Sequence, residues 1–126
     1  MKLKNDLYNI KGKNIAATEA CYDIELDPEH FIYKAHFPGE PITPGVCIIQ
    51  IAQELLEDTL GKTLQIVKVK NVKFLSVITP RQSTSVNYRI GKIAEDAASG
   101  TVKAQVTVTS ADEVKAKISF VCAEKQ

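Results

Sequence analysis

Residues 36–46 read HFPGEPITPGV, and this segment separates a strand-like pattern from a helical one. Its three prolines fix the backbone angle φ at three points and remove three backbone donors, so the segment loses little conformational entropy on folding. The end of the segment favours a helix start, because Thr43 can cap the first turn and Pro44 suits the first helical position. The sequence therefore predicts a rigid loop that leads directly into a helix.

A long helix is expected over residues 44–60, with Gly61 as its C-terminal stop. At about 100° per residue, apolar side chains cover about half of its surface and a polar arc lies opposite them. We therefore predict a mostly buried helix with one solvated polar stripe. The apolar set is Ile48, Ile49, Ile51, Ala52, Leu55, Leu56 and Leu60, and the polar arc is Gln50, Gln53, Glu54 and Glu57.

The chain before the loop is expected to hold a short helix and then one strand. Leu3, Leu7 and Ile10 have the i, i+4, i+7 spacing of an amphipathic helix, which Gly12 would end. Within residues 14–26, apolar and polar side chains alternate, as in a strand that buries one face. The alternating apolar residues are Tyr22, Ile24 and Leu26.

Four strands are expected after the helix. The first covers residues 64–74, and its alternation breaks near Lys70-Asn71, which predicts a bulge. Consecutive strands with short links favour an antiparallel sheet. We predict an α+β fold in one domain, residues 1–126, with the sheet wrapped around one long central helix. The later strands are expected over 85–90, 101–108 and 114–120, with a turn at Pro80-Arg81 and a polar connection from Gly91 to Gly100.

Composition narrows the function classes. Sixteen Lys and Arg residues against fifteen Asp and Glu give a formal charge of +1, so no global attraction to nucleic acid is expected. Three cysteines without a Cys-x-x-Cys spacing cannot form a complete disulfide framework and lack the ligand pairs of a zinc site. No apolar run is long enough to span a bilayer, and the first residues carry no signal region. We expect a cytoplasmic protein without a membrane span, a metal or a cofactor.

The loop and helix together resemble the active-site segment of the β-hydroxyacyl-acyl-carrier-protein dehydratases, hot-dog-fold enzymes of fatty acid biosynthesis. The resemblance rests on residues 36–46 and on Ala52-Gln53, and residues 69–80 resemble the downstream strand of that family. It implies dehydration of a β-hydroxyacyl thioester of acyl carrier protein or coenzyme A, with a tunnel for the acyl chain along the buried helix. It also implies a homodimer or a higher assembly of dimers, with sites that span the subunit boundary. A dimer would cover the sheet edges that a single helix leaves unprotected.

The resemblance assigns a role to each site residue. His36 matches the base that removes the α-proton, and an imidazole pKa of about 6.5 suits that task at neutral pH. The backbone N–H groups of Gly45 and Val46 would bind the thioester oxygen at the positive end of the helix dipole. Phe37 and Pro44 complete the substrate-binding set.

The main departure from the family is Gln50, fourteen positions after His36, where the family has Glu or Asp. A carboxamide cannot donate a proton as a general acid, but it can hold the substrate hydroxyl or a water. Glu54, about 6 Å further along the helix axis, is a candidate substitute. An alternative interpretation places Gln50 only in the solvated stripe. Ala35, just before His36, stands where the family usually has glycine.

Two other functions remain open. A thioesterase of the same fold would use the polar stripe to position a hydrolytic water. A non-catalytic homologue would bind acyl carriers or pair with a catalytic partner subunit. Five basic residues fit either a patch for an acidic carrier protein or a solvated strand face with a lysine-guarded edge: Lys68, Lys70, Lys73, Arg81 and Arg89.

Overall fold

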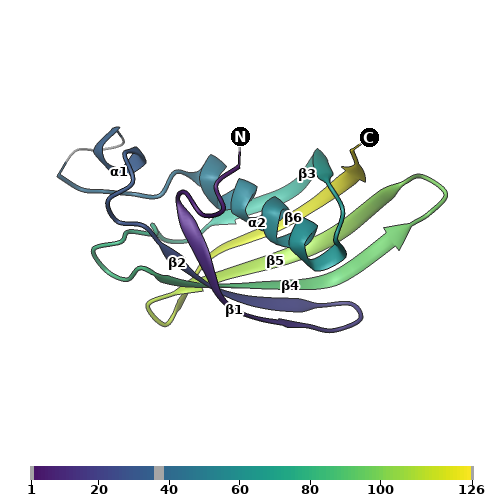
Figure 1. The fold of residues 1–126 in the computed structure, drawn as a ribbon, viewed down its shortest axis with the longest axis horizontal. Coiled ribbons are helices and arrows are strands. Elements are labelled where there is room, and N and C mark those ends of the chain that lie inside the picture. Colours follow the sequence, from purple (N-terminus) through teal and green to yellow (C-terminus); the bar gives the residue numbers. More distant parts are fainter. Residues whose placement is uncertain (1, 36–38, 126) are drawn as a thin grey trace.

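The computed structural model describes residues 2–35 and 39–125 and shows one six-stranded antiparallel sheet with a long helix across one face (Figure 1). The strand order is β1-β2-β4-β5-β6-β3, so β1 and β3 form the two edges. This arrangement confirms the predicted α+β hot-dog architecture. The elements are β1 (Tyr8–Ile15), β2 (Ala20–Leu26), α1 (Ile32–Ala35), α2 (Gly45–Leu60), β3 (Leu64–Phe74), β4 (Ser85–Asp96), β5 (Thr101–Ser110) and β6 (Glu113–Glu124).

The core lies between α2 and the sheet. The helix buries an apolar face that includes Ile51, Leu55 and Leu56, and the strands bury alternate residues opposite it. Gly61 ends the helix in the left-handed conformation at φ 65°, and its N–H donates to the carbonyl of Glu57 at 2.8 Å. Both predicted signals, the apolar periodicity and the glycine stop, are confirmed.

The predicted opening helix is wrong. Leu3 and Leu7 are buried, but the chain turns at Asn5, which has a φ of 64°. β1 then begins at Tyr8 and pairs with β2, with a bulge between Ile10 and Gly12. The single strand expected over residues 14–26 is therefore two strands joined by a turn. The spacing of Leu3 and Leu7 reflects burial of a turn, which helical periodicity does not distinguish from one helical face.

Two expectations in the second half also need correction. The polar connection expected from Gly91 is mostly strand, because β4 continues to Asp96 past a bulge that contains Lys92 at φ 50°. The alternation expected at 114–120 breaks at a second bulge, which leaves Val114 partly exposed and buries Lys115 to 1 % exposure. A bulge shifts side chains to the other face, so strict alternation fails there.

Lys115 attaches the loop between β3 and β4 to the sheet. Its ammonium donates to Gln82 Oε1 at 2.9 Å and forms an ion pair with Glu113. Its backbone carbonyl accepts from the N–H groups of Leu75 and Ser76 at 2.8 and 3.3 Å. The loop from 75 to 84 is therefore held in a defined position next to the start of α2.

The edge strand β3 carries the bulge predicted near Lys70-Asn71 and a second one between Ile66 and Lys68. Several of its apolar side chains remain exposed, among them Val67, Val69 and Phe74. Within residues 2–35 and 39–125, no helix has the length and apolar character needed to cross a membrane.

Candidate active site at the start of helix α2

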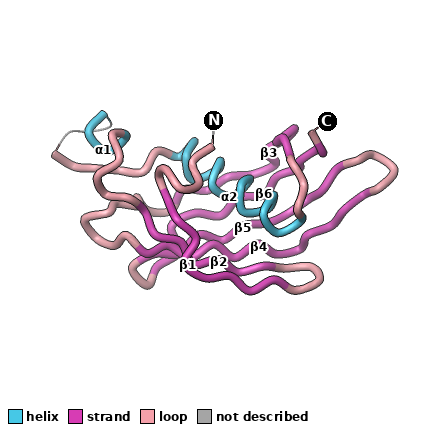
Figure 2. Tube along the Cα trace, in the orientation of Figure 1, coloured by secondary structure: helices cyan, strands magenta, loops and turns pink. Residues whose placement is uncertain are grey.

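Four of the six predicted site residues lie on the first turns of α2 or directly before it. They are Pro44, Gly45, Val46 and Gln50, whereas His36 and Phe37 lie outside the described residues. Figure 2 shows α1 at the same end of the molecule as the start of α2. The candidate site is therefore built from this end of the helix.

The segments before and after residues 36–38 are joined by a hydrogen bond between side chains. The hydroxyl of Tyr33, in α1, lies 2.9 Å from the hydroxyl of Thr43. The backbone N–H of Thr43 donates to the carbonyl of Ile78 at 2.8 Å. Thr43 was predicted as the helix cap, but its hydroxyl serves this tie instead and α2 has no side-chain cap. Sequence patterns gave no sign of Tyr33, because the pairing depends on how the loop folds.

The first backbone N–H groups of α2 have no acceptor within the helix. Pro44 is the N-cap residue, and its carbonyl accepts from the N–H groups of Cys47 and Ile48 at 3.0 and 3.1 Å. Gly45 and Val46 precede these bonds, as the first donors of any helix must. Among the described residues, neither of their N–H groups has an acceptor. The Val46 side chain is 72 % exposed. These two donors can bind an oxygen that carries negative charge.

Gln50 lies one turn further along α2 and donates from Nε2 to Glu54 Oε2 at 3.0 Å. Glu54 was predicted to lie in a solvated stripe, but it is 6 % exposed. Within the described chain, its two oxygens accept three more hydrogen bonds, from the N–H groups of Leu3 and Lys4 at 2.8 and 2.9 Å and from the Tyr8 hydroxyl at 3.0 Å. Burial, and then the charge of Glu54, raises the pKa of Tyr8, which keeps this phenol a donor.

The rest of the polar arc also binds protein. Gln53 Nε2 donates to the carbonyl of Leu64 at 2.8 Å, and Glu57 Oε2 accepts from the N–H of Leu64 at 2.7 Å. The predicted solvated stripe is therefore wrong for the buried Glu54, whereas Gln53 and Glu57 are half-buried and also bind protein groups. The polar side of α2 instead attaches the N-terminal segment and the start of β3 to the helix.

A reactive thiol and a metal site are the other kinds of chemistry to consider. Burial raises the pKa of the Cys47 thiol, so this side chain in the first turn of α2 stays protonated at neutral pH. Within the described ranges, no group of three or more His, Cys, Asp and Glu side chains is placed to hold a metal ion.

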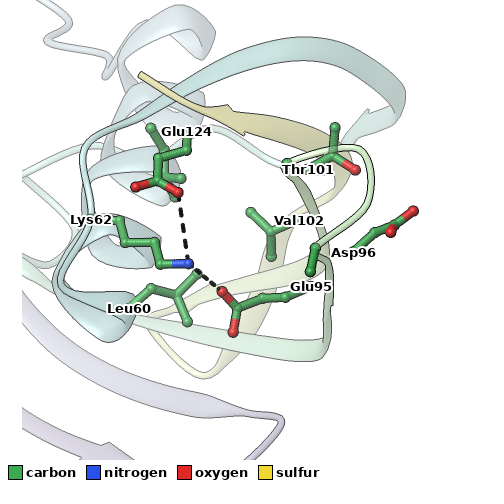
Figure 3. Close-up of a pocket in the computed structure, with 10 residues that line it drawn as sticks. Leu60, Lys62, Glu95, Asp96, Thr101, Val102 and Glu124 are labelled. Carbon is green, nitrogen blue, oxygen red and sulfur yellow. Dashed lines mark hydrogen bonds and ion pairs between the residues drawn. The ribbon is translucent and has the colours of Figure 1, made fainter. Parts of the chain in front are cut away.

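A groove of about 500 Å³ runs along the polar side of α2 and is lined by Gln50, Glu54 and Lys4, among others. A second pocket, of about 380 Å³, lies at the opposite end of α2 and contains none of the predicted site residues (Figure 3). Its rim carries Lys62, whose ammonium lies 2.9 Å from Glu95 Oε1. Exposed ion pairs of this kind contribute little to stability. The groove, rather than this pocket, is next to the candidate site.

The basic residues proposed as a carrier patch come from different elements. Lys68, Lys70 and Lys73 lie on β3, whereas Arg89 lies on β4. Two strands, β5 and β6, separate them in the sheet. The three β3 lysines lie along one edge strand of the sheet.

The chain is similar to a family model, to curated proteins and to solved structures. The family model described as ApeI-like, ApeI dehydratase, matches residues 12–115. The 3-hydroxyacyl-[acyl-carrier-protein] dehydratase FabZ of Clostridium acetobutylicum is 32 % identical over 96 residues, which cover 71 % of this chain and 67 % of that protein. FabZ of Fusobacterium nucleatum is 29 % identical over 125 residues, covering 95 % and 79 %. A solved structure, the dehydratase heterocomplex ApeI:P from Xenorhabdus doucetiae, has a TM-score of 0.71 at 19 % identity and covers 91 % of this chain and 96 % of that one.

Proposed function

This chain belongs to the ApeI-like dehydratase family, and from that membership we propose that it removes water from 3-hydroxyacyl thioesters carried by an acyl carrier protein. The observation that carries the proposal is the family match over residues 12–115, which include both the 36–46 segment and all of α2. The open N–H groups at the start of α2 support it, since a dehydratase must stabilise negative charge on the thioester oxygen.

In the proposed reaction, His36 takes the α-proton, while the N–H groups of Gly45 and Val46 hold the thioester oxygen. Phe37 and Pro44 help to bind the substrate. Gln50 holds the hydroxyl by hydrogen bonds but cannot protonate it. The imidazolium formed on His36 therefore returns the proton to the departing hydroxyl, so that the C–O bond breaks, the C=C bond forms and water leaves. A reaction without a dedicated acid is expected to be slower than one with it, because general acid assistance is worth about 10²–10⁴-fold.

The proposal includes a homodimer joined along β3. This edge strand leaves backbone groups unpaired and exposes Val69 and Phe74, and the ring of Phe74 lies against Gly45 at the start of α2. An unpaired apolar edge of this length is normally covered in a stable protein. A second copy of the chain covers it and brings the two α2 start regions into one assembly, as expected for a site shared between subunits. We place the reaction in the cytoplasm, where the thiols of Cys21, Cys47 and Cys122 remain reduced.

The direct test supplies the purified protein with a 3-hydroxyacyl thioester of acyl carrier protein and follows formation of the 2-enoyl thioester. We expect His36→Ala to lower the rate by about 100-fold or more, because it removes the base. His30→Ala is the matched control, because the His30 ring stacks on Phe31 and its Nε2 lies 3.2 Å from Asp6 Oδ2, so the ring face and Nε2 are both already directed to protein groups. Equal rates for wild type and His36→Ala would remove His36 from the mechanism.

The variant Gln50→Glu tests whether the lack of a carboxyl at this position limits the rate of dehydration. The new carboxyl would lie at hydrogen-bonding distance from Glu54, and two carboxyls so close hold one proton between them. We expect this variant to gain dehydratase activity by about 10-fold or more. Release of free thiol without enoyl product would identify a thioesterase instead. Carrier binding without turnover in any variant would identify a non-catalytic subunit.

A further inference from the structure

Glu54 is held from several directions by donors of the protein itself. Two of them, the N–H groups of Leu3 and Lys4, belong to the N-terminal segment, and a third is the hydroxyl of the fully buried Tyr8. The fourth is Gln50 Nε2, one helical turn away. A side chain fixed by hydrogen bonds to two separate elements has little freedom to rotate.

A fixed carboxylate determines which way the Gln50 amide faces. An ionised carboxylate only accepts hydrogen bonds, so Gln50 must turn its nitrogen toward Glu54. The amide oxygen then lies on the other side of the amide group. The hydrogen bond to Glu54 therefore favours one of the two amide orientations, which differ by a rotation of about 180° and have nearly the same shape.

We propose that Glu54 is a positioning residue of the dehydratase site, which orients the Gln50 amide so that its oxygen accepts the hydrogen bond from the substrate hydroxyl. This inference rests on the proposed function. Glu54 itself does not act as the displaced acid, because both of its oxygens already accept hydrogen bonds from protein groups. The N-terminal segment from Leu3 to Tyr8 becomes a part of the site through this contact.

The test is a double-mutant cycle between Gln50 and Glu54 with enoyl formation as the readout. We expect Glu54→Gln to lower kcat by about 10-fold to 100-fold with little change in KM, the range that a misplaced contact group costs. If Glu54 acts through Gln50, the double variant Gln50→Ala/Glu54→Gln loses no more activity than Gln50→Ala alone. Tyr8→Phe removes one donor to Glu54 and is the milder variant; we expect a smaller loss in the same direction.

Asp58→Asn is the matched control. Asp58 lies one turn beyond Glu54 on α2 and also ties the helix to neighbouring segments, through Tyr22, Lys13 and an ion pair of 3.7 Å with the Lys4 ammonium. We expect this variant to unfold at a lower temperature with kcat unchanged within about twofold, because none of its side-chain contacts is with Gln50 or Glu54 and the backbone N–H of Lys4 that holds Glu54 is unchanged. A loss of kcat as large as that of Glu54→Gln would mean that general loosening of α2 explains both, and would overturn the inference.

A second readout does not depend on turnover. In wild type, the two side-chain N–H protons of Gln50 should have well-separated NMR shifts, because one of them donates to a carboxylate. This separation should narrow in Glu54→Gln and persist in Asp58→Asn. Additive losses in the cycle, or an unchanged Gln50 signal, would overturn the positioning role. A wild-type protein that forms no enoyl product would overturn the proposed function instead, while the NMR comparison still decides whether Glu54 orients Gln50.

Discussion

At the start of α2, Gly45 leaves room for the aromatic ring of Phe74 from the end of β3. A Cβ atom on Gly45 would come within 2.7 Å of Phe74 Cζ and 2.9 Å of Cε2, far closer than carbon atoms pack. Gly45 is not among the glycines with positive φ, so what it provides is space. The ring thus lies beside the N–H groups that we propose as the oxygen-binding donors.

Gly45→Ala tests this contact. Alanine stabilises a helix by up to about 1 kcal/mol relative to glycine, whereas overpacking costs about 1–3 kcal/mol. Because the half-exposed ring of Phe74 can move, we expect a net loss of about 1 kcal/mol in the free energy of unfolding, measured in urea. In a Phe74→Ala background, the same substitution should stabilise the protein, since the overpacking is gone and only the higher helix propensity of alanine remains. A single Gly45→Ala variant that is more stable than wild type would contradict the contact.

Among the elements, those whose ends are marked by particular residues in the sequence were predicted well. The helix predicted over 44–60 is observed as Gly45–Leu60, because Pro44 and Gly61 mark its two ends in the sequence itself. The candidate site at the start of this helix came from the resemblance of the 36–46 segment to a known active-site segment, and the roles of His36 and Phe37 stay predictions, since both lie outside the described residues. β1 was missed, because its pairing with β2 depends on a turn that the spacing of Leu3 and Leu7 does not reveal.

The surroundings of the polar arc could not be predicted. Glu54 meets Leu3, Lys4 and Tyr8, which are 46 to 51 residues away in sequence. A helical wheel separates polar from apolar sides, but it does not tell whether water or another segment covers the polar side. The amphipathic pattern therefore gave the correct buried face and a wrong environment for the opposite one.

Asp58 makes the attachment of α2 to the strands dependent on pH. It accepts from the hydroxyl of Tyr22 at 2.7 Å and from the ammonium of Lys13 at 3.0 Å. Burial alone would raise the pKa of this carboxyl, but the hydrogen bonds from Tyr22 and Lys13 outweigh burial and hold its pKa below the ordinary 3.8. A carboxyl with a lowered pKa stabilises the fold above its unfolded pKa, and this contribution is lost as the pH falls through its folded pKa.

We therefore expect Asp58→Asn to be less stable than wild type by about 1 kcal/mol near neutral pH. The difference should shrink below about pH 4, where the wild-type carboxyl also becomes neutral. Thermal unfolding at several values between pH 7 and 2.5 measures it. Asp112→Asn, in an exposed turn, should match wild type throughout this range. A difference in stability between Asp58→Asn and wild type that stays constant down to pH 2.5 would contradict the lowered pKa of Asp58.

At the scale of the whole molecule, the two sheet edges differ in what they expose. β3 presents the exposed apolar side chains Val67, Val69 and Phe74, followed by Leu75 and Val77, whereas exposed Ile15 lies at the end of β1. We propose the β3 edge as the dimer contact, so a charge placed there should separate the subunits.

Val69→Lys is expected to convert the dimer into a monomer and to abolish enoyl formation, with the circular dichroism spectrum preserved. Ile15→Lys on the β1 edge is the matched control and should remain dimeric and active. Sedimentation velocity gives the mass of each variant. A wild-type protein that sediments as one chain would contradict the dimer, and a monomeric Val69→Lys with full activity would show that the site is complete within one subunit.

The buried ammonium of Lys115 links distant parts of the chain energetically. It fixes the loop from 75 to 84, and the carbonyl of Ile78 in that loop holds the N–H of Thr43 just before α2. The last strand is thus connected, through this loop, to Thr43 just before the helix. The geometry of the first turn of the helix therefore depends on completion of the C-terminal hairpin of β5 and β6, which comes long after it in the chain.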